Sequence, residues 1–458
     1  MGGIRARWPI VAVVVLAGAA GAVVASGGDD EREGPVAPRI GLASGADLAR
    51  AVSLEGLVDH LRRLERIASA NGGTRAAGTP GYRASVDYVS GRLREAGWSV
   101  SRERLGFPYY NESGKPRLSA GGRRIEAETL EYSAGATVDA RLQPVGDGCE
   151  RADYSSFARG RVALVARGGC YLRRIVLTAQ RAGAAAAILY YASRPGKPPS
   201  GTLIRPGARI PGVIVWGRDG AGLARRLPRV RLKVDAVSER KPTSNVIAEL
   251  GSGPLAAIAG AHLDSVGEGP GINDNGSGVA TLLELAEALG RAERPPRGRL
   301  RLAFWGAEEL GLHGSRHHAR GLSASDRRSA RGYLNLDMVA SGNGGRFVYG
   351  GRRGRTLQAA RAVRRLLRAR GEILRRADLS RASDHGPFVQ AGIPVIGLSS
   401  GADEVKTRAE QRAWGGHASR AFDPCYHRAC DRLARTDRRT FSQLADAAAV
   451  AFWTLAAR

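Results

Sequence analysis

The sequence of 458 residues predicts an α/β fold in which a mixed, mostly parallel sheet is covered by helices on both faces. The main observation is that short apolar runs alternate with stretches of helical periodicity after residue 239. In addition, hydrophobic residues make up 43% of the chain and charged residues 25%, as in ordinary globular proteins. This length and composition predict two or three domains with a large core.

Residues 1–26 predict an export signal. Arg5 and Arg7 precede an apolar stretch over residues 8–25, and its small residues favour cleavage after Ala22 or Ala25. The stretch is almost long enough to cross a membrane, so an uncleaved N-terminal anchor is the alternative. We therefore expect the remainder of the chain to be secreted or held on the outer face of the membrane. Residues 27–51 are rich in Gly, Ala and acidic residues without a period and predict a linker.

Residues 52–117 predict the first part of the main domain. Leu57, Leu61 and Leu64 are three or four positions apart, which is typical of an amphipathic helix. A loop rich in Gly, Thr and Pro follows over residues 71–82, and a second helix is expected over residues 84–96. Alternation over residues 98–105 then predicts a strand.

Residues 118–238 predict a small β-rich domain. Strands are expected at residues 162–166, 187–191 and 212–216, with a helix at residues 172–181. We interpret this domain as an insertion, because the strands that follow it need partners and residues 98–105 are the obvious one.

Residues 239–458 predict the second part of the main domain. Expected strands cover residues 244–250, 255–261, 300–305, 332–336, 347–349 and 395–398. Expected helices cover residues 279–289, 313–320, 357–368 and 439–455. In such folds, ligands bind outside the carboxyl ends of the strands, so the functional residues are expected there.

The net charge of +27 raises the question of a nucleic-acid partner. However, the basic residues are almost all Arg and are spread along the chain. The densest run, residues 361–376, carries leucines and a valine at helical spacing and no aromatic residues. This pattern is typical of a solvated helix face and not of a surface that stacks bases. We therefore expect no nucleic-acid partner.

The four cysteines pair by neighbourhood as Cys149–Cys170 and Cys425–Cys430, although three pairings are possible. Free thiols would be unusual in an exported protein. A four-cysteine zinc site is disfavoured because no C-x-x-C spacing occurs.

Five residues that can ligate metal follow predicted strands, in the order His262, Asp274, Glu309, Asp337 and His427. Two zinc ions held by histidines and carboxylates, with one carboxylate shared, can activate water against an amide bond. Asp274 lies in a Gly-rich loop and is interpreted as the shared carboxylate, since a carboxylate there would repel a phosphate.

Three further residues are expected to support this site. Glu308 stands beside Glu309 and can serve as the general base. Asp264 lies two residues after His262 and suits a hydrogen bond to the second ring nitrogen of that histidine. A bridge between Cys425 and Cys430 would hold His427 rigidly.

Other hydrolase sites are disfavoured. His313 and His317 are four residues apart, as in the H-E-x-x-H zinc peptidases, but Gly314 stands where the glutamate is needed. His317 and His318 are expected to face solvent. A site built on a serine nucleophile is the other hydrolase class, and it is not expected here.

Taken together, six stretches resemble the secreted bacterial leucine-type aminopeptidases of the co-catalytic zinc exopeptidase family, which includes aminopeptidase Y. The stretches are residues 262–266, 269–278, 305–315, 335–338, 383–388 and 423–431. The resemblance covers residues 52–117 and 240–458. The insertion is similar to a protease-associated (PA) domain in residues 149–154 and 162–170.

The resemblance implies two Zn²⁺ per chain. Asp274 would be shared, with His262 and Asp337 on one zinc and Glu309 and His427 on the other. Glu308 would be the general base, Tyr426 the oxyanion donor, and the peptide bond after Asp274 would be cis. Where relatives shape the pocket for an apolar first residue, this chain has Leu398-Ser-Ser-Gly-Ala, so the residue preference stays open.

The predicted function is therefore that of a dizinc aminopeptidase acting on peptides with a free N-terminus. Three alternatives stay open on the sequence alone: a carboxypeptidase or dipeptidase at the same site, a glutaminyl-cyclase-like transferase with one zinc, and a non-catalytic receptor. The sequence does not determine the oligomeric state or the role of the insertion.

Overall fold

The computed structural model describes residues 38–192, 200–379 and 382–457. The predicted export signal and residues 27–37 of the predicted linker lie outside these ranges. Within the described ranges, every helix is too short or too polar to cross a membrane.

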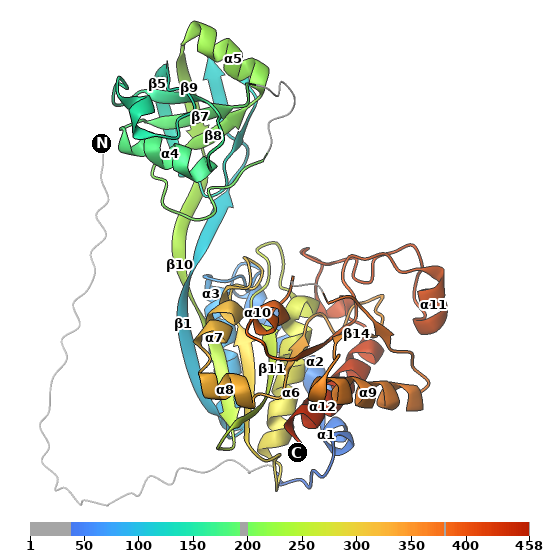
Figure 1. The fold of residues 1–458 in the computed structure, drawn as a ribbon. Coiled ribbons are helices and arrows are strands. Elements are labelled where there is room, and N and C mark those ends of the chain that lie inside the picture. The colour runs from blue at the N-terminus through green and yellow to red at the C-terminus, as the bar shows by residue number, and fades with distance from the viewer. Residues whose placement is uncertain (1–37, 193–199, 380–381, 458) are drawn as a thin grey trace, which may run out of the picture. The chain divides into compact units, whose positions relative to one another are not determined.

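The main domain is built on an eight-stranded sheet (Figure 1). Its strands, in spatial order, are β1 (Ser99–Glu112), β10 (Ala236–Leu250), β12 (Arg299–Trp305), β11 (Leu255–His262), β13 (Tyr333–Leu336), β16 (Val395–Ser399), β14 (Phe347–Gly350) and β15 (Arg375–Arg376). The four central strands, β12, β11, β13 and β16, are parallel, and β10 and β14 run antiparallel at their outer sides. The predicted mixed, mostly parallel sheet is confirmed.

Helices cover both faces of this sheet. On one face lie α3 (Pro80–Glu95), α6 (Gly278–Gly290), α9 (Gly354–Ala369) and α12 (Arg438–Ala456). On the other lie α7 (His313–Gly321), α8 (Ala324–Ser329) and α10 (His385–Gln390) (Figure 1). All eight residues of β11 are buried, because a strand covered on both faces has no solvent side.

The predicted linker is wrong over its last residues. Helix α1 (Gly45–Ala51) lies there, capped by Ser44, and packs against α12 with Leu48 fully buried. Helix α2 (Leu54–Ser69) follows, capped by Ser53, and packs against α6. A helix of seven residues is too short for its apolar period to show in the sequence, so only the tertiary contacts reveal α1.

The insertion has its own eight-stranded sheet. Its strands, in spatial order, are β3 (Arg123–Ile125), β2 (Arg117–Ala120), β9 (Arg229–Val234), β5 (Ala136–Pro144), β6 (Val162–Ala166), β7 (Ala186–Tyr190), β8 (Gly212–Val215) and β4 (Ala127–Thr129). Helices α4 (Leu172–Arg181) and α5 (Gly217–Arg226) pack against it. The predicted disulfide between Cys149 and Cys170 is present.

Strands β1 and β10 are longer than predicted. They pair antiparallel from Ser99 opposite Glu249 to Glu112 opposite Ala236. The chain therefore leaves the main domain and returns to it on adjacent strands, as an insertion requires. The sequence pattern of these strands is interrupted by Gly106, Pro108 and Pro242, because Gly and Pro are usually depleted in strands. The strands nevertheless continue past these residues, because β1 and β10 pair with each other along their whole length.

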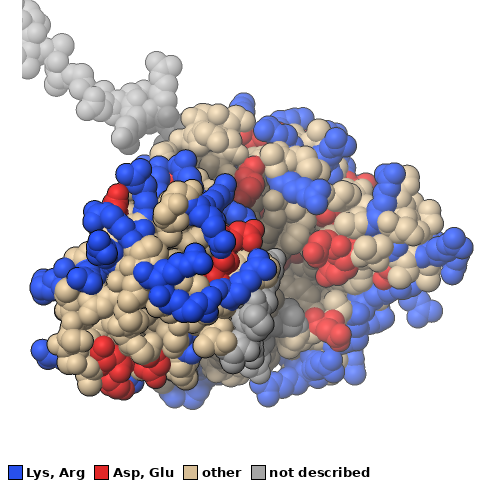
Figure 2. Space-filling view, turned by 90° about the horizontal axis from the view of Figure 1, so that it is seen from above, with Lys and Arg blue, Asp and Glu red and all other residues tan. Residues whose placement is uncertain are grey.

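The basic residues do not form one continuous stripe on the face seen in Figure 2, where Asp and Glu side chains lie among them. In α9, Ala359, Val363 and Leu367 are buried, whereas Arg361, Arg364 and the other arginines of the run face solvent. The prediction of a solvated helix face is confirmed for this segment.

Candidate metal centre

The five predicted ligands are positioned by neighbouring strands of the main sheet. His262 is the last residue of β11, and Glu309 and Asp337 follow β12 and β13. Asp274 lies in the segment Ile272–Ser277 that leads into α6, and its peptide bond to Asn275 is cis, as the resemblance implies. Since β11, β12 and β13 are parallel, their carboxyl ends meet at one edge of the sheet.

The ligand atoms meet around Asp274. Its Oδ1 lies 3.1 Å from His262 Nε2, and its Oδ2 lies 3.2 Å from His427 Nε2. His262 Nε2 is also 3.5 Å from Asp337 Oδ1, and His427 Nε2 is 3.1 Å from Glu309 Oε2. Ligand atoms of a tetrahedral zinc site are roughly 3.3 Å apart when each bond is about 2.0 Å long. The structure thus brings all five residues together in two groups that share Asp274.

The electrostatics of the cluster fit bound cations. Burial, and then the charge of Asp274, raises the pKa of Glu309 to about 7. Burial would also raise the pKa of Asp274, but hydrogen bonds from His262 and His427 lower it to about 2. Glu309 Oε1 is buried without a hydrogen-bond partner among the described residues. A cation would stabilise the charged forms of Asp274 and Glu309, because it would offset their mutual repulsion and bind the free oxygen of Glu309.

Glu308 lies beside this cluster. One of its carboxylate oxygens is within 4.8 Å of ligand atoms of both His262 and Asp337. Burial raises its pKa well above the ordinary value, and the charges of Asp384 and Asp337 act in the same direction. A raised pKa makes a carboxylate a stronger proton acceptor, which suits the role of a general base.

Asp264 supports the site, but not in the expected way. The Nδ1 of His262 lies 3.1 Å from the backbone oxygen of Asp264 and 4.0 Å from its carboxylate. A carbonyl oxygen only accepts, so Nδ1 carries the proton and Nε2 is left to bind metal. The carboxylate of Asp264 instead accepts the backbone N–H groups of Glu308 and Glu309, at 3.2 and 3.4 Å. It therefore orients the loop that carries both glutamates.

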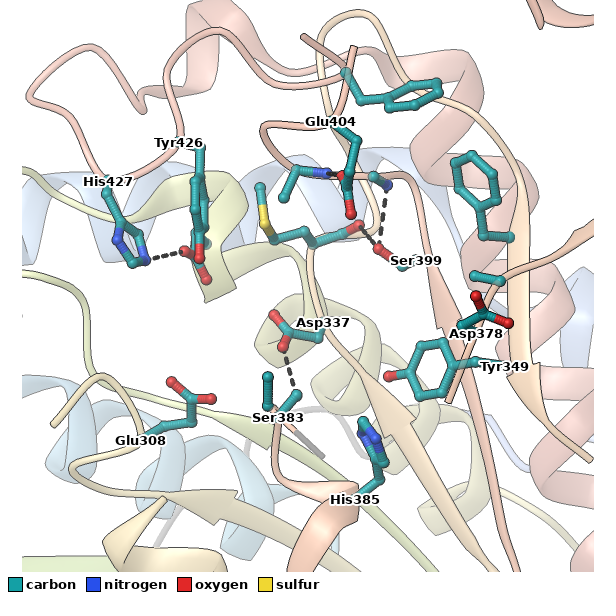
Figure 3. Close-up of a pocket in the computed structure, with 18 of the residues that line it drawn as sticks. Glu308, Asp337, Tyr349, Asp378, Ser383, His385, Ser399, Glu404, Tyr426 and His427 are labelled. Atoms are coloured by element: carbon teal, nitrogen blue, oxygen red, sulfur yellow. Dashed lines mark hydrogen bonds and ion pairs between the residues drawn. The ribbon is translucent and has the colours of Figure 1, made fainter. Parts of the chain in front are cut away.

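Tyr426 and His427 are two of the four residues between Cys425 and Cys430, which form the predicted disulfide. Their rings stack with centroids 3.8 Å apart. Both side chains line the pocket at the metal centre (Figure 3).

Two residues that hold the Asp274 segment were not predicted. Asp431, just beyond the disulfide, accepts the backbone N–H groups of Asn273 and Asp274 at 2.7 and 2.9 Å. Arg75, which is fully buried, donates to the backbone oxygens of Leu263, Pro270 and Gly271. Arg75 belongs to the loop over residues 71–82. The sequence predicts this loop, but not that its arginine contacts the segment before Asp274.

A chain of hydrogen bonds also supports Asp337. Trp305 Nε1 donates to Tyr333, whose hydroxyl donates to Asn335. Asn335 in turn donates to Ser383 Oγ, which donates to Asp337 Oδ2 at 2.6 Å. The chain starts in the core below the sheet edge and ends on a predicted ligand, so it fixes the orientation of that carboxylate.

Ser383→Ala is expected to weaken binding of the metal held by Asp337 about 10-fold or more, because residues that orient a ligand usually contribute 10- to 100-fold to affinity. The measurement is zinc affinity by competition with a chelator. The control is Ser399→Ala, since Ser399 lines the same pocket and its hydroxyl contacts the backbone oxygen of Met338. Equal affinities in both variants would contradict this role of Ser383.

Among the described residues, neither His313 nor His317 belongs to a group of potential metal ligands. His318, expected to face solvent, is 5% exposed. Its Nδ1 lies 2.8 Å from Glu103 and its Nε2 lies 3.2 Å from Arg301. The expectation is wrong because the short helix α7 packs this face against β1 and β12, which the surrounding polar sequence does not reveal.

The metal centre opens into a pocket of about 800 Å³. Its lining includes Met338, Phe347 and Phe422. Tyr349, Ser399 and Glu404 also line it (Figure 3). A pocket of this size fits one or two amino-acid residues of a peptide beside the metal centre.

Family models match both parts of the chain. Residues 245–452 match peptidase family M28, and residues 136–223 match the PA domain. An aminopeptidase of Pseudomonas aeruginosa is 36% identical over 436 residues, which cover 88% of this chain and 81% of the relative. The probable lipoprotein aminopeptidase LpqL of Mycobacterium tuberculosis is 37% identical over 430 residues, covering 88% and 84%.

Solved structures of aminopeptidases also resemble this chain. The aminopeptidase from Aneurinibacillus sp. strain AM-1 superposes with a TM-score of 0.63 at 27% identity, covering 90% of this chain and 96% of that one. The zinc aminopeptidase BSAP of Bacillus subtilis superposes with a TM-score of 0.58 at 25% identity, covering 89% and 96%. The predicted resemblance, the fold class and the zinc-aminopeptidase class of enzyme are confirmed by these relatives. The chain therefore belongs to peptidase family M28 and carries a PA domain.

Proposed function

We propose that this M28 peptidase removes N-terminal residues from peptides at a centre of two zinc ions. The observation that carries the proposal is the placement of Asp274, whose two carboxylate oxygens each face a different histidine. In this proposal His262 and Asp337 complete one site, and Glu309 and His427 complete the other. Zinc at these positions would acidify water and polarise the scissile carbonyl group.

The side chains of the pocket have distinct roles in the proposed reaction. Glu308 accepts a proton from the attacking water and then delivers it to the leaving amine. The Tyr426 hydroxyl donates a hydrogen bond to the oxygen that gains negative charge. Burial, followed by the neighbouring carboxylates, raises the pKa of Tyr426, so its hydroxyl keeps the proton that it needs for this donation.

The lining of the pocket favours an aminopeptidase over a carboxypeptidase. Apart from the proposed zinc ligands and Glu308, three acidic residues and a single arginine, Arg316, line it within the described part of the chain. The three acidic residues are Asp378, Glu404 and Glu410. An acidic lining attracts the ammonium group of a peptide N-terminus and repels a terminal carboxylate.

Three peptides that share one sequence test this proposal: one with a free amine and a C-terminal amide, one acetylated at the amine, and one acetylated with a free carboxylate. We expect cleavage of the first alone, loss of that cleavage with a zinc chelator, and recovery on adding Zn²⁺. Cleavage of the third peptide instead would favour the carboxypeptidase alternative. Cleavage unaffected by the chelator would contradict the metal centre.

We also propose that the enzyme works outside the cytosol, either secreted or held on the outer face of the membrane. Two disulfides support this, since such bonds persist in oxidising compartments. Fractionation of the native host, with detection of the enzyme in medium and membrane fractions, separates the cleaved signal from the anchor.

A further inference from the structure

A second cluster of metal-ligating side chains lies between α2 and α6. It consists of His60 on α2 and of Glu284 and Glu287, which are one helical turn apart on α6. His60 is 4% exposed and Glu284 6%. None of the three lines the pocket at the metal centre, so the proposed aminopeptidase reaction does not account for them.

The spacing of these side chains matches that of metal ligands. His60 Nε2 lies 3.7 Å from Glu284 Oε1 and 3.4 Å from Glu287 Oε1. All three potential ligand atoms lie within 4.8 Å of one another. The corresponding separations around His262 and His427 are 3.1–3.5 Å. A single ion with bonds of about 2.0–2.2 Å could therefore reach all three residues after small side-chain adjustments.

The imidazole of His60 is oriented as a ligand. Its Nδ1 lies 2.6 Å from the hydroxyl of Tyr88, whereas its buried Nε2 has no hydrogen-bond partner among the described residues. Ligating histidines usually donate their other ring N–H to an oxygen, which leaves the ligating nitrogen unprotonated. In that tautomer, the Nε2 lone pair of His60 faces two carboxylates that cannot donate. A cation between them would remove this repulsion.

Each carboxylate is also held in place from outside the cluster. The backbone N–H of Ser53 donates to Glu284 Oε2 at 2.8 Å, and Arg92 donates to Glu287 Oε1 at 2.6 Å. Glu284 Oε1 remains available to an ion. Glu287 Oε1 faces His60 and would be shared between the ion and Arg92. Arg62, Arg63 and Arg66 line the same depression but are solvent-exposed, so water screens their charge.

We propose that His60, Glu284 and Glu287 bind one divalent transition-metal ion, with zinc as the chemically best matched, at a structural site separate from the active site. One imidazole and two carboxylates suit Zn²⁺ or Co²⁺ better than Ca²⁺, which prefers six or more oxygen ligands. The ion would fasten α2 to α6, the helix that follows directly from the Asp274 segment. Its role is therefore to stabilise the fold around the active site.

The test uses the full chain, stripped with a chelator and reloaded with Zn²⁺. We expect wild-type protein to retain one zinc equivalent more than His60→Gln or Glu287→Gln, measured by elemental analysis after gel filtration. Saturating Zn²⁺ should also raise the Tm of wild type above that of both variants by several degrees. Asp59→Asn is the matched control, since Asp59 lines the same depression, is exposed and is not a ligand, and it should behave as wild type.

Equal zinc content in wild type and all three variants would overturn the proposal and leave His60 as the partner of an ion pair. If His60→Gln does not fold, Glu287→Gln decides alone, because Glu287 is partly exposed. The readout is a difference of one equivalent between proteins, so it does not depend on how many ions the active site holds. Peptidase activity per active-site zinc should be unchanged in Glu287→Gln, which separates this result from a failure of the proposed function.

Discussion

Glu308→Gln is expected to keep its bound zinc and to lose about 10²- to 10⁴-fold in kcat, the usual contribution of a positioned general base. Glutamine has nearly the same size and can still accept a hydrogen bond, but it cannot take a proton from water. Neither proposed zinc ion uses Glu308 as a ligand, so the metal content should not change. The measurement is kcat on a free-amine peptide together with zinc content by elemental analysis.

The control for this experiment is Glu268→Gln, which removes the same charge from an exposed position between His262 and Asp274. It should retain kcat near the wild-type value. If Glu308→Gln were as active as this control, Glu308 could not be the base, and Glu309 or Asp384 would have to be tested in its place. Burial raises the pKa of Asp384 to about 7.

Asp274→Asn is expected to lose both zinc ions and to reduce activity to background, because the Asp274 carboxylate lies against both His262 and His427. An amide offers one neutral oxygen where the carboxylate offers two charged ones, so neither site keeps its full set of ligands. His427→Asn, by contrast, should lose a single equivalent and leave the site of His262 and Asp337 occupied. Elemental analysis of the three proteins, loaded in parallel, measures this difference.

The result distinguishes a shared carboxylate from two independent sites. Loss of only one equivalent in Asp274→Asn would contradict the bridging assignment, whatever happens to activity. Circular dichroism is needed as a check that each variant is folded. Neither Asp274→Asn nor His427→Asn changes His60, Glu284 or Glu287. The further zinc proposed between α2 and α6 should therefore remain bound in both variants.

Much of the candidate centre was predictable because its residues follow buried strands. His262, Glu309 and Asp337 come at or just after apolar runs that can only be strands of a covered sheet. The carboxyl ends of parallel strands meet at one edge, so residues far apart in sequence were expected to lie together. The order of ligand types then pointed to zinc, and the structure places all five residues as that argument requires.

What could not be predicted depends on which atom of a side chain reaches which neighbour. Asp264 was expected to bind His262 through its carboxylate, yet it uses its backbone oxygen and turns the carboxylate to Glu308 and Glu309. Similarly, the support of Asp274 by Asp431 and the buried guanidinium of Arg75 arise from segments that meet only in the folded chain. The periodicity of the local sequence carries no information about contacts between distant segments.

By itself, the sequence predicted the fold class, the insertion and the candidate metal ligands, because burial periodicity and strand ends are local properties of the chain. Three features are apparent only in the tertiary structure: helix α1, the burial of His318, and the cluster of His60 with Glu284 and Glu287. These features depend on the packing of surfaces that are distant in sequence. Side chains of the same type face solvent elsewhere in this chain, so residue identity alone does not distinguish them.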